Sequence, residues 1–247
     1  MPKKSRTGSK SLEPQQERSR ESLQKLLRAA TEVMGQHGFE GATIPRIARH
    51  AGLTPGSVYR RFRDKEALLE TAILGILERQ DANLNALTPE MVREIPLPVF
   101  ADQIINGFVV GYRARAPLIR AMRQFVQGRV GTPFWRKASR LEVRTYERLV
   151  DLFLMHSERI NHPDPRIAVS TALMMAVSTV HELVVLEQDV AAWKGLLPKD
   201  DQALKRELVR AFLNYLGVEK PSGSAGKMED DTLAAMNRWR ERSSPHV

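Results

Sequence analysis

TIPRIARHAGLTPGSVYRRF, residues 43–62, decides the fold of this chain, because it predicts two short helices joined by a tight turn. Thr43 stands where its side chain would cap the first helix by accepting hydrogen bonds from the first-turn amides. Gly52 ends that helix, since glycine adopts the left-handed conformation of a sharp turn at little cost. Thr54 then caps the second helix, with Pro55 at its first position. The segment therefore predicts a helix-turn-helix.

The two predicted helices have one apolar side and one polar side. Ile47 and Ala48 share the inner face of the first helix, and Val58 and Phe62 of the second point back towards them. The outward face of the second helix carries Thr54, Ser57, Tyr59, Arg60 and Arg61. By spacing alone this face suits DNA about as well as it suits plain solvent, since short motifs match many helical proteins.

The flanking residues make the pattern more specific, because the run from Thr43 to Glu66 resembles the DNA-binding signature of the TetR family of bacterial transcription regulators. The resemblance covers about the first third of the chain and implies an all-α fold. It implies an N-terminal helix-turn-helix DNA-binding domain followed by a larger helical ligand-binding and dimerisation domain. The matching residues are Thr43, Ile47, Ala48, Ala51, Gly52, Leu53, Gly56, Ser57, Val58, Tyr59, Phe62, Asp64, Lys65 and Leu68.

The resemblance also implies which side chains meet DNA. A recognition helix from Pro55 to Phe62 would enter the major groove of a roughly palindromic operator, with Arg61 as the best guanine reader. Thr43, Tyr59 and Lys65 would hold phosphates, which fixes register without reading sequence. The other expected DNA-binding residues are Arg46, Thr54, Pro55, Gly56, Ser57 and Arg60.

The positive charge is concentrated on this part of the chain. The formal net charge is +9, and residues 1–66 carry 14 Lys and Arg against 7 Asp and Glu. The rest of the chain carries 24 against 22. Such a footprint suits the phosphates of DNA, although a membrane surface would attract the same charge.

The chain of 247 residues contains no cysteine, which excludes disulfides, thiolate catalysis and cysteine-based redox sensing. Its start is basic and lacks the apolar run of a secretory signal, so we expect a cytoplasmic protein. Residues 1–18 are expected to form a disordered basic arm, which solubilises the chain or reaches the DNA backbone.

Two unequal domains are expected. The DNA-binding domain comprises residues 19–66, with a first helix that Gly38 stops, and a connecting helix at 65–84 capped by Asp64. An effector-binding and dimerisation domain spans 85–217, beginning with a connection to Pro98 that holds three prolines. Residues 218–247 form a flexible tail that suggests a short amphipathic helix.

The sequence of the second domain predicts a series of helices. The first covers residues 99–115, and a shorter second helix begins at Pro117. Three more helices are predicted from Pro133 to Ile160, at 166–186 and at 200–215. The helix at 166–186 has the length of a membrane span, but its Ser, His and Glu side chains favour a core helix that is covered on several sides. The resemblance implies a homodimer through the helices near 165–187 and 200–216.

Several body helices carry aromatic and methionine side chains that could line an apolar cavity. Taken singly, each of these residues is more typical of ordinary core packing. As a set they resemble the family's effector-binding interior and indicate an unknown, mainly apolar small-molecule effector. The candidates are Phe108, Tyr112, Phe125, Tyr146, Phe153, Met174, Met175 and His181.

No catalytic or metal motif is complete. His181 and Glu182 begin a zinc-protease motif, but Val185 stands where the second histidine belongs. His156 and His162 are six apart, so they do not share a helical face. We therefore expect no cofactor, no metal and no enzyme, and the leading hypothesis is a repressor released from its operator by a ligand. An architectural or ligand-independent DNA binder, or an enzyme acting on a small molecule, remains an alternative.

Overall fold

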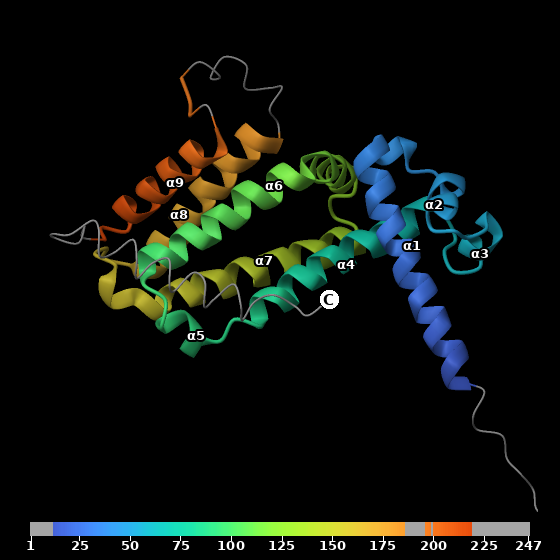
Figure 1. Cartoon of the computed structure of the whole chain (residues 1–247), viewed down its shortest axis with the longest axis horizontal. Coiled ribbons are helices and arrows are strands. Elements are labelled where there is room, and N and C mark those ends of the chain that lie inside the picture. The colour runs from blue at the N-terminus through green and yellow to red at the C-terminus, as the bar shows by residue number, and fades with distance from the viewer. Residues whose placement is uncertain (1–11, 186–195, 199, 219–247) are drawn as a thin grey trace, which may run out of the picture. The chain divides into compact units, whose positions relative to one another are not determined.

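The computed structural model describes residues 12–185, 196–198 and 200–218, and these contain helices and no strand (Figure 1). The all-α fold predicted from the sequence is confirmed. The helices in chain order are α1 (Leu12–Gly41), α2 (Ile44–His50), α3 (Pro55–Tyr59), α4 (Lys65–Asn85), α5 (Pro89–Arg93), α6 (Leu97–Gln127), α7 (Pro133–Phe153), η1 (Leu154–Arg159), α8 (Pro165–Val180), η2 (His181–Val185) and α9 (Asp201–Tyr215).

The chain forms two compact units. The first, here called the head, holds the described residues up to Arg79 together with Pro117–Ala138. The second, here called the body, holds Gln80–Ala116 and the described residues from Ser139 onward. The helices α4, α6 and α7 each contribute residues to both units. The units therefore differ from the predicted domain limits at Pro117–Ala138, which belongs to the head.

The head is built on α1, with α2 and α3 beside it (Figure 1). Leu26, Ala30, Val33 and Met34 of α1 are almost completely buried, as their helical spacing predicted. Gly38 has a φ of 68° and interrupts the regular helix at the predicted position, before one further turn that ends at Gly41. The positive φ explains why a glycine stands here.

The first helix starts earlier than the sequence predicted. The structure begins α1 at Leu12 instead of Ser19, so residues 12–18 of the expected disordered arm are helical. Pro14 lies in the first turn, where a missing amide hydrogen breaks no hydrogen bond, so it permits this earlier start. Residues 1–11 of the arm and residues 219–247 of the predicted tail lie outside the described residues.

Pro117 does not open a new helix, contrary to the prediction, because α6 runs without interruption from Leu97 to Gln127. A proline inside a helix removes one hydrogen bond to the carbonyl four residues earlier. Pro117 is exposed, so solvent can satisfy that carbonyl. Phe125, eight residues later, packs edge-on against Phe39 of α1 at 5.0 Å and against Phe134 of α7 at 5.6 Å between ring centroids. This aromatic contact anchors Pro117–Ala138 in the head.

Other helix ends also differ from the prediction. The expected connection before Pro98 contains α5, whose first turn is capped because Met91 N donates to Thr88 Oγ1 at 3.3 Å. The helix from Pro133 ends at Phe153 and continues as a 3-10 helix. The apolar helix α8 ends at Val180 and continues as a π-helix to Val185. Local turn geometry at these ends is decided by packing, which periodicity does not report.

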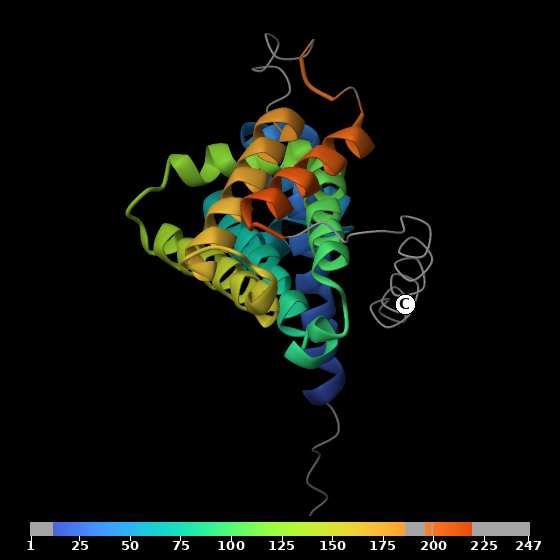
Figure 2. The ribbon, with the colours of Figure 1, turned by 90° about the vertical axis from the view of Figure 1, so that its left-hand side faces the viewer.

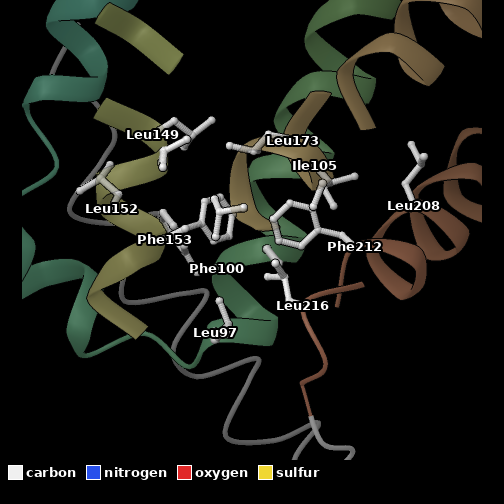
Figure 3. Packing of buried hydrophobic residues seen from close by; sticks show 14 of the residues in the cluster. Leu97, Phe100, Ile105, Leu149, Leu152, Phe153, Leu173, Leu208, Phe212 and Leu216 are labelled. Atoms are coloured by element: carbon white, nitrogen blue, oxygen red, sulfur yellow. The ribbon is translucent and has the colours of Figure 1, made fainter. Parts of the chain in front are cut away.

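Three phenylalanines form the centre of the body core (Figure 3). Phe153 of α7 lies between Phe100 of α6 and Phe212 of α9, with centroid distances of 4.7 and 5.0 Å. His156 is buried beside Phe100, with 5% of its surface exposed, and burial lowers its pKa, which favours a neutral ring. The histidine that follows the core phenylalanine therefore belongs to the packing of the body.

The apolar helix α8 runs beside α9 in both views (Figures 1 and 2). The segment Pro165–Val185 is long and apolar enough to cross a membrane by length and composition. One of its faces lies in the body core, where Ala168, Val169, Ala172 and Leu173 are buried. Ile167, Met174 and Met175 are 58%, 63% and 42% exposed. Among the described residues, α8 is therefore buried on one side and carries these three exposed apolar side chains on the other.

The glycine after α9 is required both by its backbone conformation and by a close contact, and these two causes can be tested separately. Gly217 has a φ of 64°, and a Cβ built on it would lie 2.7 Å from the Asn161 carbonyl oxygen. Gly131 has a similar φ of 81° but open space around it. We expect Gly217→Ala to lower the free energy of unfolding by about 2–4 kcal/mol, and Gly131→Ala by only about 1 kcal/mol. Equal losses in urea unfolding would show that backbone conformation alone, without the clash, accounts for Gly217.

Candidate functional site

The turn between α2 and α3 has the geometry that the sequence predicted. Gly52 adopts a φ of 67°, and Leu53 N donates to Ala48 O at 2.8 Å. Thr54 caps α3, because its Oγ1 accepts from Ser57 N at 3.3 Å, and Ser57 Oγ donates to Thr54 O at 2.7 Å. The helix α3 ends at Tyr59 and is shorter than the predicted Pro55–Phe62, although Phe62 N still donates to Val58 O at 3.0 Å.

One buried side chain fixes α3 on the head. Val58, Ile47 and Ala48 are fully buried, so the inner faces of both helices are those predicted. Ser57 is half-buried and Tyr59 is 57% exposed. Because α3 has only five residues, the orientation of its outer face depends on that anchor. The exposed DNA-binding candidates of this segment are Thr54, Pro55, Gly56, Tyr59, Arg60 and Arg61.

Thr43 precedes α2 but does not cap it with its side chain, contrary to the prediction. Its main-chain oxygen accepts from Ile47 N at 2.9 Å, and its side chain is exposed. Arg46, one turn into α2, donates from Nη1 to Gly41 O at 2.6 Å. The Thr43 hydroxyl therefore stays available to an external acceptor or donor.

Two basic candidates have partners in the head. Arg61 donates to Ser22 Oγ at 3.3 Å and to Ser19 Oγ at 3.2 Å, both on α1. Lys65 lies with Nζ 4.0 Å from the centroid of Phe39 and donates to Phe39 O at 3.4 Å. The side chain of Arg60, by contrast, has no hydrogen bond or ion pair with a described residue. These contacts depend on α1, which the sequence of the motif does not report.

A second cation joins the same aromatic cluster. Arg129 follows α6, and its Cζ lies 3.4 Å from the Phe125 centroid and 5.3 Å from that of Phe39. Its Nε lies 3.7 Å from Glu70 Oε1 on α4. Arg129 thus connects Pro117–Ala138 to the start of α4 within the head. Sequence reasoning missed it, and its only signal was a basic residue in a turn after an aromatic helix.

The eight predicted pocket residues lie in several parts of the described structure. Phe125 lies in the head cluster and Phe153 in the body core. Phe108 contacts Tyr112 edge-on on α6, with centroids 6.1 Å apart. The Tyr146 hydroxyl of α7 lies close to that of Tyr112, and this proximity contributes to the raised pKa of Tyr146. The other three lie on α8 and η2, where Met174 and Met175 are exposed and His181 is half-buried beside Glu182.

A groove of 420 Å³ lies between α7 and α8 in the body. Of the predicted pocket residues, Tyr146 and Met174 line it. Most of its surface is apolar, and its polar side chains lie among aliphatic ones. The lining residues are Val143, Tyr146, Glu147, Val150, Arg166, Ser170, Leu173, Met174, Val177 and Ser178.

Titratable side chains gather beside this groove. Burial raises the pKa of Tyr112, and burial together with Tyr112 and Glu142 raises the pKa of Tyr146 well above its usual range. Burial also raises the pKa of the Glu142 carboxyl, which lies one helical turn before Tyr146. Within the described residues, no three His, Asp or Glu side chains are placed to hold a metal ion.

The sequence similarity to known proteins lies mainly in the head. The profile of "Bacterial regulatory proteins, tetR family" matches residues 26–72, which hold α2, α3 and the start of α4. The HTH-type transcriptional regulator UidR of Escherichia coli K12 is 36% identical over 55 residues, 22% of this chain and 28% of UidR. The HTH-type transcriptional regulator BetI of Escherichia coli O139:H28 is 41% identical over 63 residues, 25% of this chain and 32% of BetI. The chain thus spans about a third or less of the curated relatives it matches.

Solved structures extend the likeness of fold to most of the chain. A protein of Mesorhizobium loti MAFF303099 assigned to the TetR-family transcriptional regulators aligns with a TM-score of 0.62 at 18% identity, covering 81% of this chain and 97% of that chain. The fatty acid degradation regulator FadR of Bacillus halodurans aligns with a TM-score of 0.56 at 18% identity, covering 80% and 99%. Residues 26–72 therefore resemble the bacterial regulatory proteins of the TetR family, and most of the chain shares the helical fold of these solved structures.

Proposed function

We propose that this protein is a sequence-specific DNA-binding transcription regulator. One observation carries the proposal: the fully buried Val58 fixes α3 on the head, so that the polar and basic side of a capped recognition helix faces outward. A short helix that carries the exposed Tyr59 and is followed by exposed Arg side chains can enter a major groove. The positive charge of residues 1–66 supplies the attraction to phosphate.

The contacts divide by what they can recognise. The exposed Thr43 hydroxyl, Tyr59 and Lys65 hold phosphates, with Arg46 beside them on α2. Lys65 reaches a phosphate from the start of α4, where the helix amides also attract anions. Base edges are read from the face of α3 and the residues after it, namely Thr54, Pro55, Gly56, Ser57, Arg60 and Arg61.

A homodimer presents two such heads to one operator. The side of α8 that carries the exposed Ile167 and Met175 suits a partner, because neighbouring exposed apolar side chains favour association. The helix α9 adds an exposed polar face with Gln202, Arg206, Arg210 and Ala211. Two-fold symmetry then requires a roughly palindromic site whose half-sites lie about one DNA turn apart, or a multiple.

The regulator represses from its operator in the cytoplasm and is released by a small ligand held in the body. Ligand binding favours a dimer whose heads no longer match the spacing of the DNA grooves. The extent to which the operator is released depends on how much more tightly the ligand binds that dimer than the DNA-binding one. The helix α4 contributes residues to both head and body, so it is the route by which a change in the body reaches Lys65.

Selection of genomic fragments tests this function. Purified protein at near-physiological salt is mixed with fragments of the source genome, and the retained DNA is sequenced. We expect enrichment of a palindrome beside particular genes. Uniform recovery of all fragments would contradict sequence-specific regulation and favour an architectural DNA binder.

Two arginine and lysine variants test the division of labour in the head. We expect Arg61→Ala to cost about 1–3 kcal/mol of binding to the selected operator and to relax preference at one base pair. Lys65→Ala should weaken binding to operator and random DNA alike, because a phosphate contact carries no sequence information. Fluorescence anisotropy on both DNAs measures this. Equal losses on both DNAs for Arg61→Ala would remove it from the base-reading set.

The contacts of Arg61 on α1 provide the control. To read a base, its guanidinium must leave Ser19 and Ser22. The double variant Ser19→Ala/Ser22→Ala should therefore keep or slightly raise operator affinity, since a competing set of hydrogen bonds is gone. If the double variant instead lost as much operator affinity as Arg61→Ala, the role of Arg61 would be to hold α1 and α3 together.

A further inference from the structure

We propose that the groove between α7 and α8 binds an amphipathic cation, an ammonium or amidinium group on an apolar body, and that such a compound is the effector. The inference rests on the proposed function for its regulatory meaning, because it identifies the ligand class of the body. The binding itself requires only the groove.

The groove is shaped for the apolar part of a ligand. Val150 and Leu173 are buried at its base, and Val143, Tyr146 and Met174 are 54%, 38% and 63% exposed along it. Large apolar side chains from two helices are thus gathered around one hollow of 420 Å³, within the range of small-molecule sites. A ligand that covers them gains burial roughly in proportion to the apolar area removed from water.

The charges at the groove favour a cation. Arg166, the only basic side chain among the lining residues, donates from Nη2 to Asp151 Oδ1, so its charge is already balanced. Glu147 also lines the groove, and it makes no ion pair or hydrogen bond with a described residue. Glu142 lies one turn before Tyr146 on α7, and it is likewise without an ion pair or hydrogen bond among described residues. Among the lining residues, the Glu147 carboxylate is therefore the charge that has no ion pair with a described residue.

Aromatic rings stand next to those carboxylates. Tyr146 lies between Glu142 and Glu147 along α7, and it lines the groove. A ring face beside carboxylates attracts a cation. Arg115 also lies near Tyr112, and it keeps its positive charge there, because its Nε donates to the neutral Gly111 O at 3.1 Å within α6. The Glu147 carboxylate, which lines the groove, disfavours an anionic head group beside it.

Three matched amphiphiles test the ligand class on the full-length protein. Decyltrimethylammonium, decanol and decanoate share a ten-carbon chain and differ in charge, and each is titrated below its micelle concentration by calorimetry. We expect the cation to bind roughly fivefold or more tightly than the alcohol, and the carboxylate to bind more weakly than both. Equal affinities, or tighter binding of decanoate, would overturn the proposal.

Isosteric variants locate the charge. Glu147→Gln and Glu142→Gln should each weaken decyltrimethylammonium several-fold and leave decanol unchanged, because only a charge is removed. Glu158→Gln is the matched control, since Glu158 is an exposed carboxylate beside Arg159 in η1 and does not line the groove. Thermal unfolding verifies that each variant is folded. If all three variants behaved alike, the groove carboxylates would not select the ligand.

A bulky variant distinguishes a ligand from a second copy of the chain. Ser170 lines the groove on the exposed side of α8, so Ser170→Trp fills part of the hollow. We expect it to abolish binding of the cation and the alcohol while sedimentation still shows the wild-type assembly. Dissociation of the assembly by this variant, with no amphiphile bound by the wild type, would mean that a second copy occupies the groove.

The effector role has a separate readout. Decyltrimethylammonium should release the selected operator from the wild type, and release by the Glu147→Gln variant should require several-fold more of it. Binding of the cation without release would overturn the effector role. A protein that selects no operator in the absence of any amphiphile would instead contradict the proposed function, so the two failures are distinguishable.

Discussion

Val58→Asp should abolish operator binding and unfold the head. Val58 is fully buried under α3, and a carboxylate there would have no cationic partner in the apolar interior that holds Ile47 and Ala48. Burial of an unpaired ionised group costs several kcal/mol, and with α3 only five residues long no other side chain of the helix is buried to hold it. Hydrogen exchange should show loss of protection in α2 and α3, and anisotropy should show no operator binding.

The neighbouring residue provides the control. Tyr59 is 57% exposed, so Tyr59→Asp adds the same charge without burying it. It should also weaken DNA binding, because a carboxylate opposes phosphate, yet amide protection in the head should remain. A head that stays protected in Val58→Asp would contradict the anchoring role of this valine.

Phe153→Ala should lower the free energy of unfolding by about 3–5 kcal/mol. The side chain is fully buried between Phe100 and Phe212, so its removal leaves a cavity that three helices cannot close together (Figure 3). Chemical denaturation followed by circular dichroism measures the change. Tyr215→Ala on α9 is the control, since Tyr215 is 40% exposed and its loss should cost no more than about 1 kcal/mol.

A loss of less than about 1 kcal/mol in Phe153→Ala would contradict its place at the centre of the core. The head should keep its own amide protection in this variant, because its buried residues belong to a separate compact unit. Val58→Asp and Phe153→Ala therefore test the two units independently.

The turn between α2 and α3 was predictable from the sequence, because the residues that determine it are neighbours in the chain. Gly52 has the positive φ that its place after an apolar helix predicted, and Thr54 caps α3 as expected. Gly38 and Asp64 likewise mark helix ends where the sequence placed them. A glycine at positive φ or a cap three residues before its amide donor involves only neighbours in the chain, so composition and spacing report it.

Longer-range features were not predictable from periodicity. Pro117 favours a helix break locally, yet α6 continues through it, and the packing of Phe125 against Phe39 and Phe134 joins the segment to the head. The aromatic set expected to form one pocket is divided among the head cluster, the body core and the groove between α7 and α8. An apolar stripe on one helix shows which side chains are to be buried, but it does not show which other helix packs against them.

The sequence by itself determined that this chain is helical, that residues 43–62 form a capped helix-turn-helix and that positive charge gathers around it, because these follow from neighbours and composition. Only the tertiary structure decided that Arg61 and Lys65 lie against α1 and its final turn, that Arg129 joins the head, and that Tyr146 meets Tyr112 beside a groove. Each of these contacts joins residues far apart in the chain. Their formation depends on how whole helices pack, and no local pattern encodes that arrangement.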